Sequence, residues 1–158
     1  MEKLTTGDNA PDFSLPANGG EVSLNDFAGE WLVLYFYPRD FTEGCTTEAC
    51  EFRDALASRV MDATVVGISP DDVESHERFK AEHNLPFELL SDEDTEVARA
   101  YGAYGNRGAF GMGVKRSTFI IDPDGKIARA YYNVRVKDHA EQVTRDLNDL
   151  KGLQAQAR

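Results

Sequence analysis

Cys45 and Cys50 are the two cysteines of the chain, and both lie in the segment 38–50, which reads PRDFTEGCTTEAC. If Thr42 is the N-cap of a helix, Cys45 is the third helical residue and its sulfur faces the unpaired backbone amides of the first turn. Helix N-termini and nearby cations stabilise a thiolate, which is the nucleophilic form of cysteine. Cys45 is therefore the candidate nucleophile. The alternative is that both cysteines are small buried hydrophobic residues.

The residues around Cys45 favour a reactive site over simple packing. The Thr42 hydroxyl can cap the helix and offer a hydrogen bond to an incoming oxygen. Gly44 adds no side-chain bulk beside the sulfur. Pro38 fixes the backbone where the chain enters the loop, and it keeps that side of the pocket apolar and dry.

The five-residue spacing of Cys45 and Cys50 separates their thiols within a helix. At about 100° and 1.5 Å per residue, their Cα atoms are roughly 8 to 9 Å apart and about 140° from each other around the axis. A disulfide needs Cα atoms within about 7 Å. A bond between the two thiols therefore requires the first turns of the helix to unwind, which predicts that oxidation is coupled to local unfolding.

An attack on an O–O bond also needs hydrogen-bond donors for the departing oxygen and a cation near the sulfur. Arginine supplies both. The candidates are Arg39 in the same loop and Arg116, which precedes the apolar segment 117–121. A lone arginine at the start of a strand is more often a solvated surface residue, so the residues alone leave this choice open.

Alternating strand and helix patterns surround the cysteine segment. Period-two alternation, buried apolar runs and turn residues predict strands at 12–15, 21–24, 31–37, 63–69, 87–90, 117–122 and 126–132. Apolar residues spaced by three and four, together with capping residues, predict helices at 42–59, 70–83, 94–101 and 138–152. The residues after Gly152 are expected to fray.

This order of elements predicts an α/β, thioredoxin-like fold, with a mixed central β-sheet flanked by helices on both faces and an N-terminal hairpin. The whole chain, 1–158, is expected to form a single domain. Functional groups in open sheets gather beyond the carboxyl ends of the central strands, where the segment after 31–37 lies. The cysteine-bearing loop is therefore in the expected place for an active site.

Composition narrows the classes of partner. With 17 basic and 28 acidic residues the formal net charge is −11, which repels phosphate backbones and anionic lipid heads, so neither nucleic acid nor a membrane is an expected partner. The longest apolar run, 31–37, is far shorter than the about 20 residues of a spanning helix. The N-terminus lacks the layout of a signal peptide, so we expect a cytoplasmic location with reduced thiols.

Other residue groups predict no additional site. The histidines lie among charged residues on predicted helices, so solvated positions are expected rather than metal ligation at His76, His83 and His139. The glycine-rich segment 102–113 has no phosphate-binding pattern and is expected to form a mobile loop near the site. Its Phe110 and Met112 either line the pocket or form a weak dimer contact.

At the cysteine segment the chain resembles the peroxiredoxins, and within them the PrxQ or bacterioferritin-comigratory-protein (BCP) subfamily. Pro38, Thr42 and Cys45 match the Pro-x-x-x-Thr-x-x-Cys signature of that family, and the second cysteine follows five residues later, as is usual in PrxQ-type members. The similarity covers nearly the whole chain, notably the stretches 35–38, 46–54, 67–71, 87–92 and 116–122.

The resemblance implies a thioredoxin fold and thiol-dependent reduction of hydrogen peroxide and organic hydroperoxides, without a metal or a bound cofactor. Cys45 looks like the peroxidatic cysteine, and Thr42, Pro38 and Arg116 look like the remaining residues of the active-site signature. Cys50 looks like the resolving cysteine. In the implied cycle Cys45 becomes a sulfenic acid, Cys50 condenses with it to form an intramolecular disulfide, and thioredoxin or a similar dithiol restores both thiols.

Three neighbours of the nucleophile need separate interpretation. Glu48 lies three residues after Cys45 on the same helix face, where it either holds an arginine or is an ordinary surface helix former. Where PrxQ-type relatives commonly have proline, this chain has Glu43, and we expect its charge to point to solvent because an inward carboxylate would oppose the thiolate. Phe41 replaces a residue that is usually small or polar, which favours apolar hydroperoxides or a covered pocket.

The leading hypothesis is an enzyme, a thioredoxin-dependent peroxidase of the atypical 2-Cys type that acts as a monomer or weak homodimer. One alternative is a thioredoxin-like disulfide reductase, but the C-x-x-C motif expected after the first central strand is absent. Another is a redox-responsive binding module in which disulfide formation only exposes apolar surface.

Overall fold

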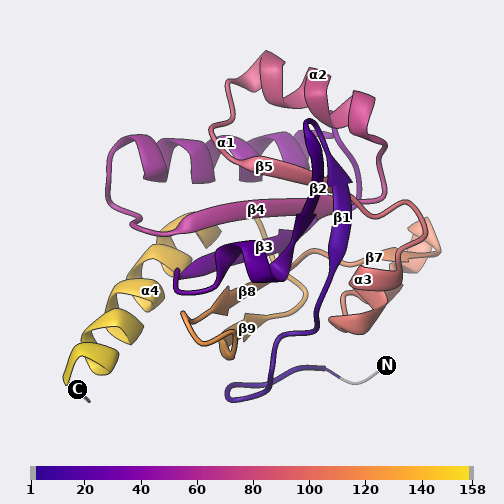
Figure 1. Cartoon of the computed structure of the whole chain (residues 1–158). Coiled ribbons are helices and arrows are strands. Elements are labelled where there is room, and N and C mark those ends of the chain that lie inside the picture. Colours follow the sequence, from indigo (N-terminus) through magenta and orange to yellow (C-terminus); the bar gives the residue numbers. More distant parts are fainter. Residues whose placement is uncertain (1–2, 157–158) are drawn as a thin grey trace.

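The computed structural model describes residues 3–156, with side chains through residue 153. Figure 1 shows the elements in chain order, which are β1 (Ser14–Ala17), β2 (Gly20–Ser23), β3 (Leu32–Phe36), α1 (Glu43–Ala57), β4 (Thr64–Ser69), α2 (Val73–His83), β5 (Glu88–Ser91), α3 (Glu96–Ala100), β6 (Tyr104–Asn106), β7 (Met112–Val114), β8 (Ser117–Ile121), β9 (Ile127–Tyr131) and α4 (His139–Gln156). Short 3₁₀ helices occupy Leu24–Phe27 and Gly108–Phe110.

Five strands form the central sheet in the order β5-β4-β3-β8-β9. β3 runs parallel to β4 and antiparallel to β8, so the sheet is mixed, as predicted. All five residues of β3 are buried, because both faces of this central strand are covered. The segment that carries Cys45 leaves the carboxyl end of β3 and enters α1.

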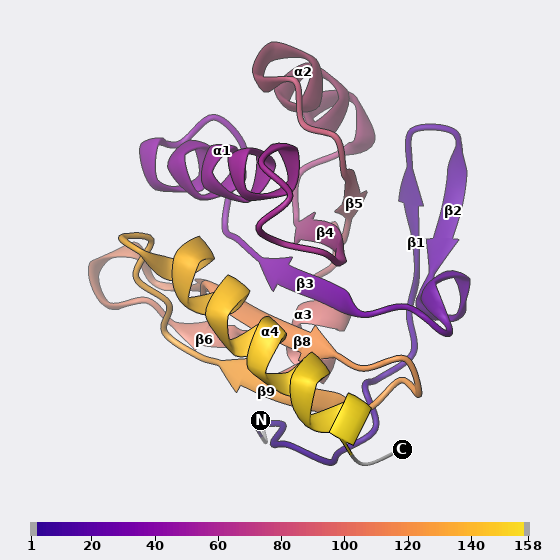
Figure 2. The same cartoon turned by 90° about the vertical axis from the view of Figure 1, so that its left-hand side faces the viewer.

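α1, α2 and α4 cover one face of the sheet, and the β1–β2 hairpin and α3 cover the other. Val33 and Tyr35 of β3 belong to the core cluster that α1, α2 and α4 complete. Leu34 and Phe36 belong to the other core cluster, which includes residues of the β1–β2 hairpin and of α3. Figure 2 shows α4 in front of β8 and β9, and the β1–β2 hairpin at the right-hand edge of the molecule. This alternation along β3 accounts for its continuous apolar sequence, and the predicted helices on both faces are confirmed.

The segment expected to be a mobile loop contains a second hairpin. β6 and β7 pair antiparallel, with Tyr104 opposite Val114 and Asn106 opposite Met112. The strands were missed because each has three residues and glycines interrupt their alternation. Phe110 and Met112 are 79% and 64% exposed at the tip of this hairpin.

The last helix is longer than predicted, because α4 continues through Gly152 to Gln156. A helical glycine costs about 1 kcal/mol relative to alanine, which tertiary contacts can offset. Val143 and Leu147 of α4 are fully buried against the sheet, and Lys151 pairs with Asp62 at 3.0 Å just before the glycine. The expected fraying after residue 152 is therefore wrong through residue 156, and residues 157–158 lie outside the described part of the chain.

Within residues 3–156, no helix has both the length and the apolar composition needed to cross a membrane.

Candidate active site

The reactive segment begins as the sequence predicts, with Thr42 as the N-cap of α1 and Cys45 as its third residue. Thr42 has an extended backbone, and its carbonyl oxygen accepts a hydrogen bond from the Thr46 amide at 2.9 Å. The Thr42 hydroxyl does not cap the helix, which corrects the prediction. It donates to the Arg39 carbonyl at 2.9 Å instead, because the chain turns sharply at Phe41, where φ is 64°.

Arg116 is the cation that reaches the nucleophile. Its Nη2 donates a hydrogen bond to Cys45 Sγ at 3.3 Å, while Cys45 itself is only 1% exposed. The pairing of β3 with β8 explains this contact, since Phe36 at the end of β3 lies opposite Ser117, the residue after Arg116. Arg39, the other candidate, has an exposed side chain. A guanidinium beside a thiol sulfur favours the charged thiolate.

Glu48 holds the other end of the same guanidinium. Arg116 Nη1 donates to Glu48 Oε1 at 2.7 Å, and Glu48 is 2% exposed. Burial raises the pKa of Glu48 to about 7, although the charge of Arg116 acts in the opposite direction. The second carboxylate oxygen is buried and has no hydrogen-bond partner among the described residues. The position of Glu48 therefore matches an arginine-holding residue and not the surface helix former.

Arg116 keeps its charge although its side chain is largely buried. Burial alone would lower its pKa, but the facing Glu48 and Cys45 raise the pKa above its ordinary value. The guanidinium thus offers one N–H to the sulfur and another to the carboxylate. Such a fork arrangement fixes its orientation as well as its charge.

Gly44 lets Arg116 lie against the first turn of α1. A Cβ atom at Gly44 would be 3.1 Å from Arg116 Nη2 and 3.9 Å from Val136 Cγ2. The first distance is tighter than ordinary van der Waals contact, so a side chain at Gly44 would push the guanidinium by a few tenths of an ångström. Pro38 is half-buried just after β3, at the start of the loop.

Cys50 lies in the same helix as Cys45 and is half-buried, and both thiols are free. Because α1 is continuous from Glu43 to Ala57, the expected separation of the two cysteines applies to this structure. The site therefore brings together Cys45, Arg116, Glu48 and Gly44, but not Cys50.

The two unusual residues of the loop lie at its surface. Glu43 is exposed, in agreement with the expectation that its charge points to solvent. Phe41 is 46% exposed, and its ring contacts Phe79 of α2 edge to face, with centroids 5.2 Å apart. The loop therefore presents an aromatic surface beside the start of α1.

Two of the three histidines are buried, which overturns the expectation of solvated positions. His76 and His139 are 3% and 4% exposed, and His83 is half-buried. His76 lies three residues before the buried Phe79 on the inner face of α2, a spacing that could have indicated burial. His139 Nε2 lies 2.8 Å from Thr118 Oγ1. Burial, aided by the charge of Arg116, lowers the pKa of His139 to about 4, so its ring is neutral at pH 7.

Sequence reasoning also missed the polar residues beneath the loop. Asp40 is 3% exposed and is hydrogen-bonded to Tyr37 and His76. An aspartate in a loop beside an arginine resembles a surface residue by sequence alone, and its partners on α2 are more than 30 residues away.

Comparisons with known proteins agree with this geometry. Residues 6–130 match the model of the AhpC/TSA family. Peroxiredoxin Bcp of Bacillus subtilis is 46% identical over 152 residues, covering 93% of this chain and 97% of that protein. A cysteine-to-serine variant of PrxQ from Xylella fastidiosa superimposes with a TM-score of 0.84 at 34% identity, covering 100% of both chains.

A third similar protein has a structure described in terms of its activity. It is the Xanthomonas campestris bacterioferritin comigratory protein, reported as a trapped intermediate or ligand complex of alkyl peroxide reduction. It superimposes with a TM-score of 0.84 at 34% identity, over 94% of this chain and 98% of that one. With the fold, the cysteine site and these likenesses in agreement, the chain belongs to the AhpC/TSA family as a thioredoxin-fold peroxiredoxin of the Bcp and PrxQ type.

Proposed function

We propose that this peroxiredoxin reduces hydrogen peroxide and organic hydroperoxides with Cys45 as the peroxidatic cysteine and Cys50 as the resolving cysteine. The observation that carries the proposal is the hydrogen bond from Arg116 to Cys45 Sγ at the N-terminus of α1, with Glu48 holding the same guanidinium. This arrangement supports a thiolate and places a donor where charge develops on a transferring oxygen.

The first step oxidises Cys45. Its thiolate attacks one peroxide oxygen, the O–O bond breaks, and the departing oxygen takes a proton and leaves as water or an alcohol. The sulfur is oxidised to a sulfenic acid and the peroxide is reduced by two electrons. Arg116 offsets the negative charge on the departing oxygen, and the Thr42 hydroxyl oxygen, whose hydrogen is used on Arg39, accepts a hydrogen bond from the peroxide O–H.

The second step forms the disulfide. The first turns of α1 unwind, the Cys50 thiolate attacks the Cys45 sulfur, and the sulfenic oxygen takes a proton and leaves as water. A dithiol reductant then exchanges with the disulfide and returns both cysteines to thiols. Thioredoxin is the proposed reductant, in a reducing cytoplasmic setting.

The loop surface supports organic hydroperoxides as substrates. The exposed ring of Phe41 packs on buried Phe79 beside the start of α1, where it can contact an apolar substituent. Alkyl peroxide reduction is named for the Xanthomonas campestris relative. The exposed Phe110 and Met112 suit a weak contact between two copies, so we propose a monomer in equilibrium with a weak homodimer.

A coupled assay tests the function. Hydroperoxide is added to the protein with thioredoxin, thioredoxin reductase and NADPH, and NADPH consumption is followed for hydrogen peroxide and for an alkyl hydroperoxide. Cys45→Ser should abolish turnover. Cys50→Ser should keep a single stoichiometric oxidation and lose recycling, which mass spectrometry of the oxidised protein can establish. Full turnover by Cys45→Ser would refute the proposal. If the protein is instead a redox-responsive binding module, the wild type will show no turnover.

A further inference from the structure

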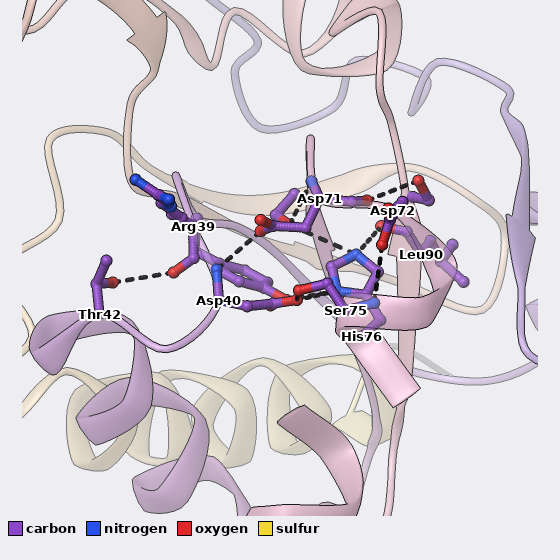
Figure 3. A network of polar contacts seen from close by, with 11 residues as sticks. Arg39, Asp40, Thr42, Asp71, Asp72, Ser75, His76 and Leu90 are labelled. Carbon is purple, nitrogen blue, oxygen red and sulfur yellow. Dashed lines mark hydrogen bonds and ion pairs between the residues drawn. The ribbon is translucent and has the colours of Figure 1, made fainter. Parts of the chain in front are cut away.

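A buried group of polar side chains lies beneath the loop that leads to Cys45, and Figure 3 shows its arrangement around Asp40. The Asp40 carboxylate accepts hydrogen bonds from the Tyr37 hydroxyl at 2.6 Å, the Ser75 hydroxyl at 2.8 Å and His76 Nδ1 at 2.7 Å. We call Tyr37, Asp40, Asp71, Ser75 and His76 the Asp40 network. None of the roles assigned above to Cys45, Arg116 or Glu48 uses it.

The backbone of the loop is held as well. The Asp40 amide donates to Asp71 Oδ2 at 2.8 Å, and the same oxygen accepts from the Ser69 hydroxyl at 2.6 Å. Ser91 donates to the Asp71 carbonyl at 2.7 Å. Hydrogen bonds at Asp40 therefore connect the loop that precedes α1 directly to α2 and, through Asp71, to the ends of β4 and β5.

His76 uses both ring nitrogens in the network. Nδ1 faces the Asp40 carboxylate, and Nε2 faces the Leu90 carbonyl at 3.0 Å. The ring therefore lies between a carboxyl group of the loop and a backbone carbonyl of β5. The Tyr37 and Ser69 hydroxyls are each 3.4 Å from a ring nitrogen, but their hydrogens are used on Asp40 and Asp71. His76 thus joins Asp40 to the backbone of β5.

The same geometry argues against a metal ion in the network. Ligand atoms of Asp40, Asp71 and His76 lie within 4.8 Å of one another, as they would around a cation. However, the nearest oxygen and nitrogen of Asp40 and His76 are bonded to each other at 2.7 Å, and the Asp71 oxygen is used by Asp40 and Ser69. Each of these ligand atoms therefore already has a hydrogen-bond partner within the network.

Burial changes abruptly after Asp40. Tyr37 and Asp40 are 1% and 3% exposed, whereas Phe41, Thr42 and Glu43 are all exposed. Phe41 also has a left-handed backbone, with φ at 64°, which is strained for a residue other than glycine. The fixed part of the loop therefore ends at Asp40, and the exposed part runs directly into the helical turn that carries Cys45.

We propose that Asp40 and His76 are positioning residues for Cys45. By fixing the loop at Asp40 they favour the closed first turn of α1, in which Arg116 reaches the sulfur, and they oppose the unwinding that lets Cys50 approach. The inference rests on the proposed function for its catalytic consequences, but its structural consequence is independent of that function. Loss of the Asp40–His76 bond slows oxidation of Cys45 and speeds disulfide formation.

Asp40→Asn and His76→Gln are the test variants, and Asp72→Ala is the matched control. Asp72 caps α2 through the Ser75 amide at 2.8 Å, so its loss weakens the same helix without removing a bond to Asp40. Hydrogen exchange of the reduced proteins, followed by mass spectrometry over residues 41–49, measures opening without any peroxide. Because a charge-assisted hydrogen bond is lost, exchange there should rise about tenfold in Asp40→Asn and His76→Gln and should stay near wild type in Asp72→Ala.

Rapid quenching with mass spectrometry measures the two redox steps. In the test variants the rate of Cys45 oxidation should fall about tenfold, and the share of sulfinic acid at high peroxide should fall because the disulfide forms sooner. A merely structural role would make Asp72→Ala behave in the same way, which would overturn the inference. Unchanged exchange in folded His76→Gln would also overturn it, as would stoichiometric zinc binding that Asp40→Asn abolishes. An inactive wild type with the expected exchange pattern would refute the peroxidase proposal alone.

Discussion

At the residue scale, Gly44 sets how closely the arginine can approach the reactive sulfur. A Cβ atom at Gly44 would lie 3.1 Å from the guanidinium of Arg116, and the same guanidinium donates to both Cys45 and Glu48. Backbone conformation does not require glycine there, because Gly44 is helical and is absent from the residues with positive φ. The requirement for glycine is therefore one of space.

Gly44→Ala should separate activity from stability. Alanine favours a helix over glycine by about 1 kcal/mol, so the free energy of unfolding should not fall, while oxidation of Cys45 should slow about tenfold as Arg116 moves from the sulfur. Gly152→Ala in α4 is the matched control, since its Cβ would meet nothing within 4 Å. It should raise stability and leave the oxidation rate unchanged. Equal rates for the two variants in stopped-flow peroxide assays would contradict this reading of Gly44.

At the element scale, α1 serves two incompatible arrangements. The continuous helix places Cys45 beside Arg116 and keeps Cys50 away, whereas the disulfide requires the first turns to unwind. In the proposed cycle, the stability of those turns sets how long the sulfenic acid of Cys45 persists. Thr47 is an exposed site in this region, and its hydroxyl donates to the Glu43 carbonyl at 3.0 Å.

Substitutions at Thr47 should move the resolving step in opposite directions. Alanine has higher helix propensity than threonine by about 0.6 kcal/mol, and glycine has a lower one, so disulfide formation should slow about threefold in Thr47→Ala and quicken in Thr47→Gly. The rate of the first oxidation should change little, because Thr47 does not contact Arg116. Quench-flow mass spectrometry measures both steps. Equal rates of disulfide formation in the two variants would show that unwinding of α1 does not limit this step.

Local patterns predicted the elements better than the contacts between them. The apolar run of β3 and the Thr42 signal placed Cys45 correctly at the third position of α1, because both are properties of short segments. The resemblance, and not periodicity, selected Arg116, since its contact with Cys45 spans 71 residues and depends on the pairing of β3 with β8. The burial of Asp40 was missed for the same reason, because aspartate is an ordinary surface type until its partner is known, whereas the spacing of His76 from Phe79 in α2 could have indicated burial.

At the scale of the whole molecule, two buried titratable groups give stability opposite dependences on pH. Glu48 has a folded-state pKa of about 7, above the ordinary 4.5. Between these two pH values the folded protein keeps the proton that the unfolded chain has lost, so stability falls as pH rises from 4.5 to 7. His139 has a folded-state pKa of about 4, below the ordinary 6.5, so the unfolded chain takes up the proton first and stability falls as pH drops from 6.5 towards 4. Between pH 5 and 7 the two effects oppose each other.

Single substitutions should reveal each effect. From pH 5 to pH 7, the free energy of unfolding of Glu48→Gln should rise relative to wild type by about 2 kcal/mol, and that of His139→Gln should fall relative to wild type by a similar amount. Urea unfolding at several pH values measures both differences. Parallel stability curves for the wild type and Glu48→Gln would mean that burial does not perturb this carboxyl group.

The hydrogen bond between Arg116 and Cys45 joins residues 71 positions apart. It depends on the pairing of β3 with β8, and β8 is synthesised long after β3. During synthesis the cysteine leaves the ribosome long before the arginine does. Until Arg116 emerges, the nascent chain carries Cys45 without the guanidinium beside it. Oxidants then react with this thiol as slowly as with any exposed cysteine. If Arg116 activates Cys45 as proposed, reactivity is acquired only after residue 116 has been translated and β8 has paired with β3, which spares shorter nascent chains from oxidation by peroxide.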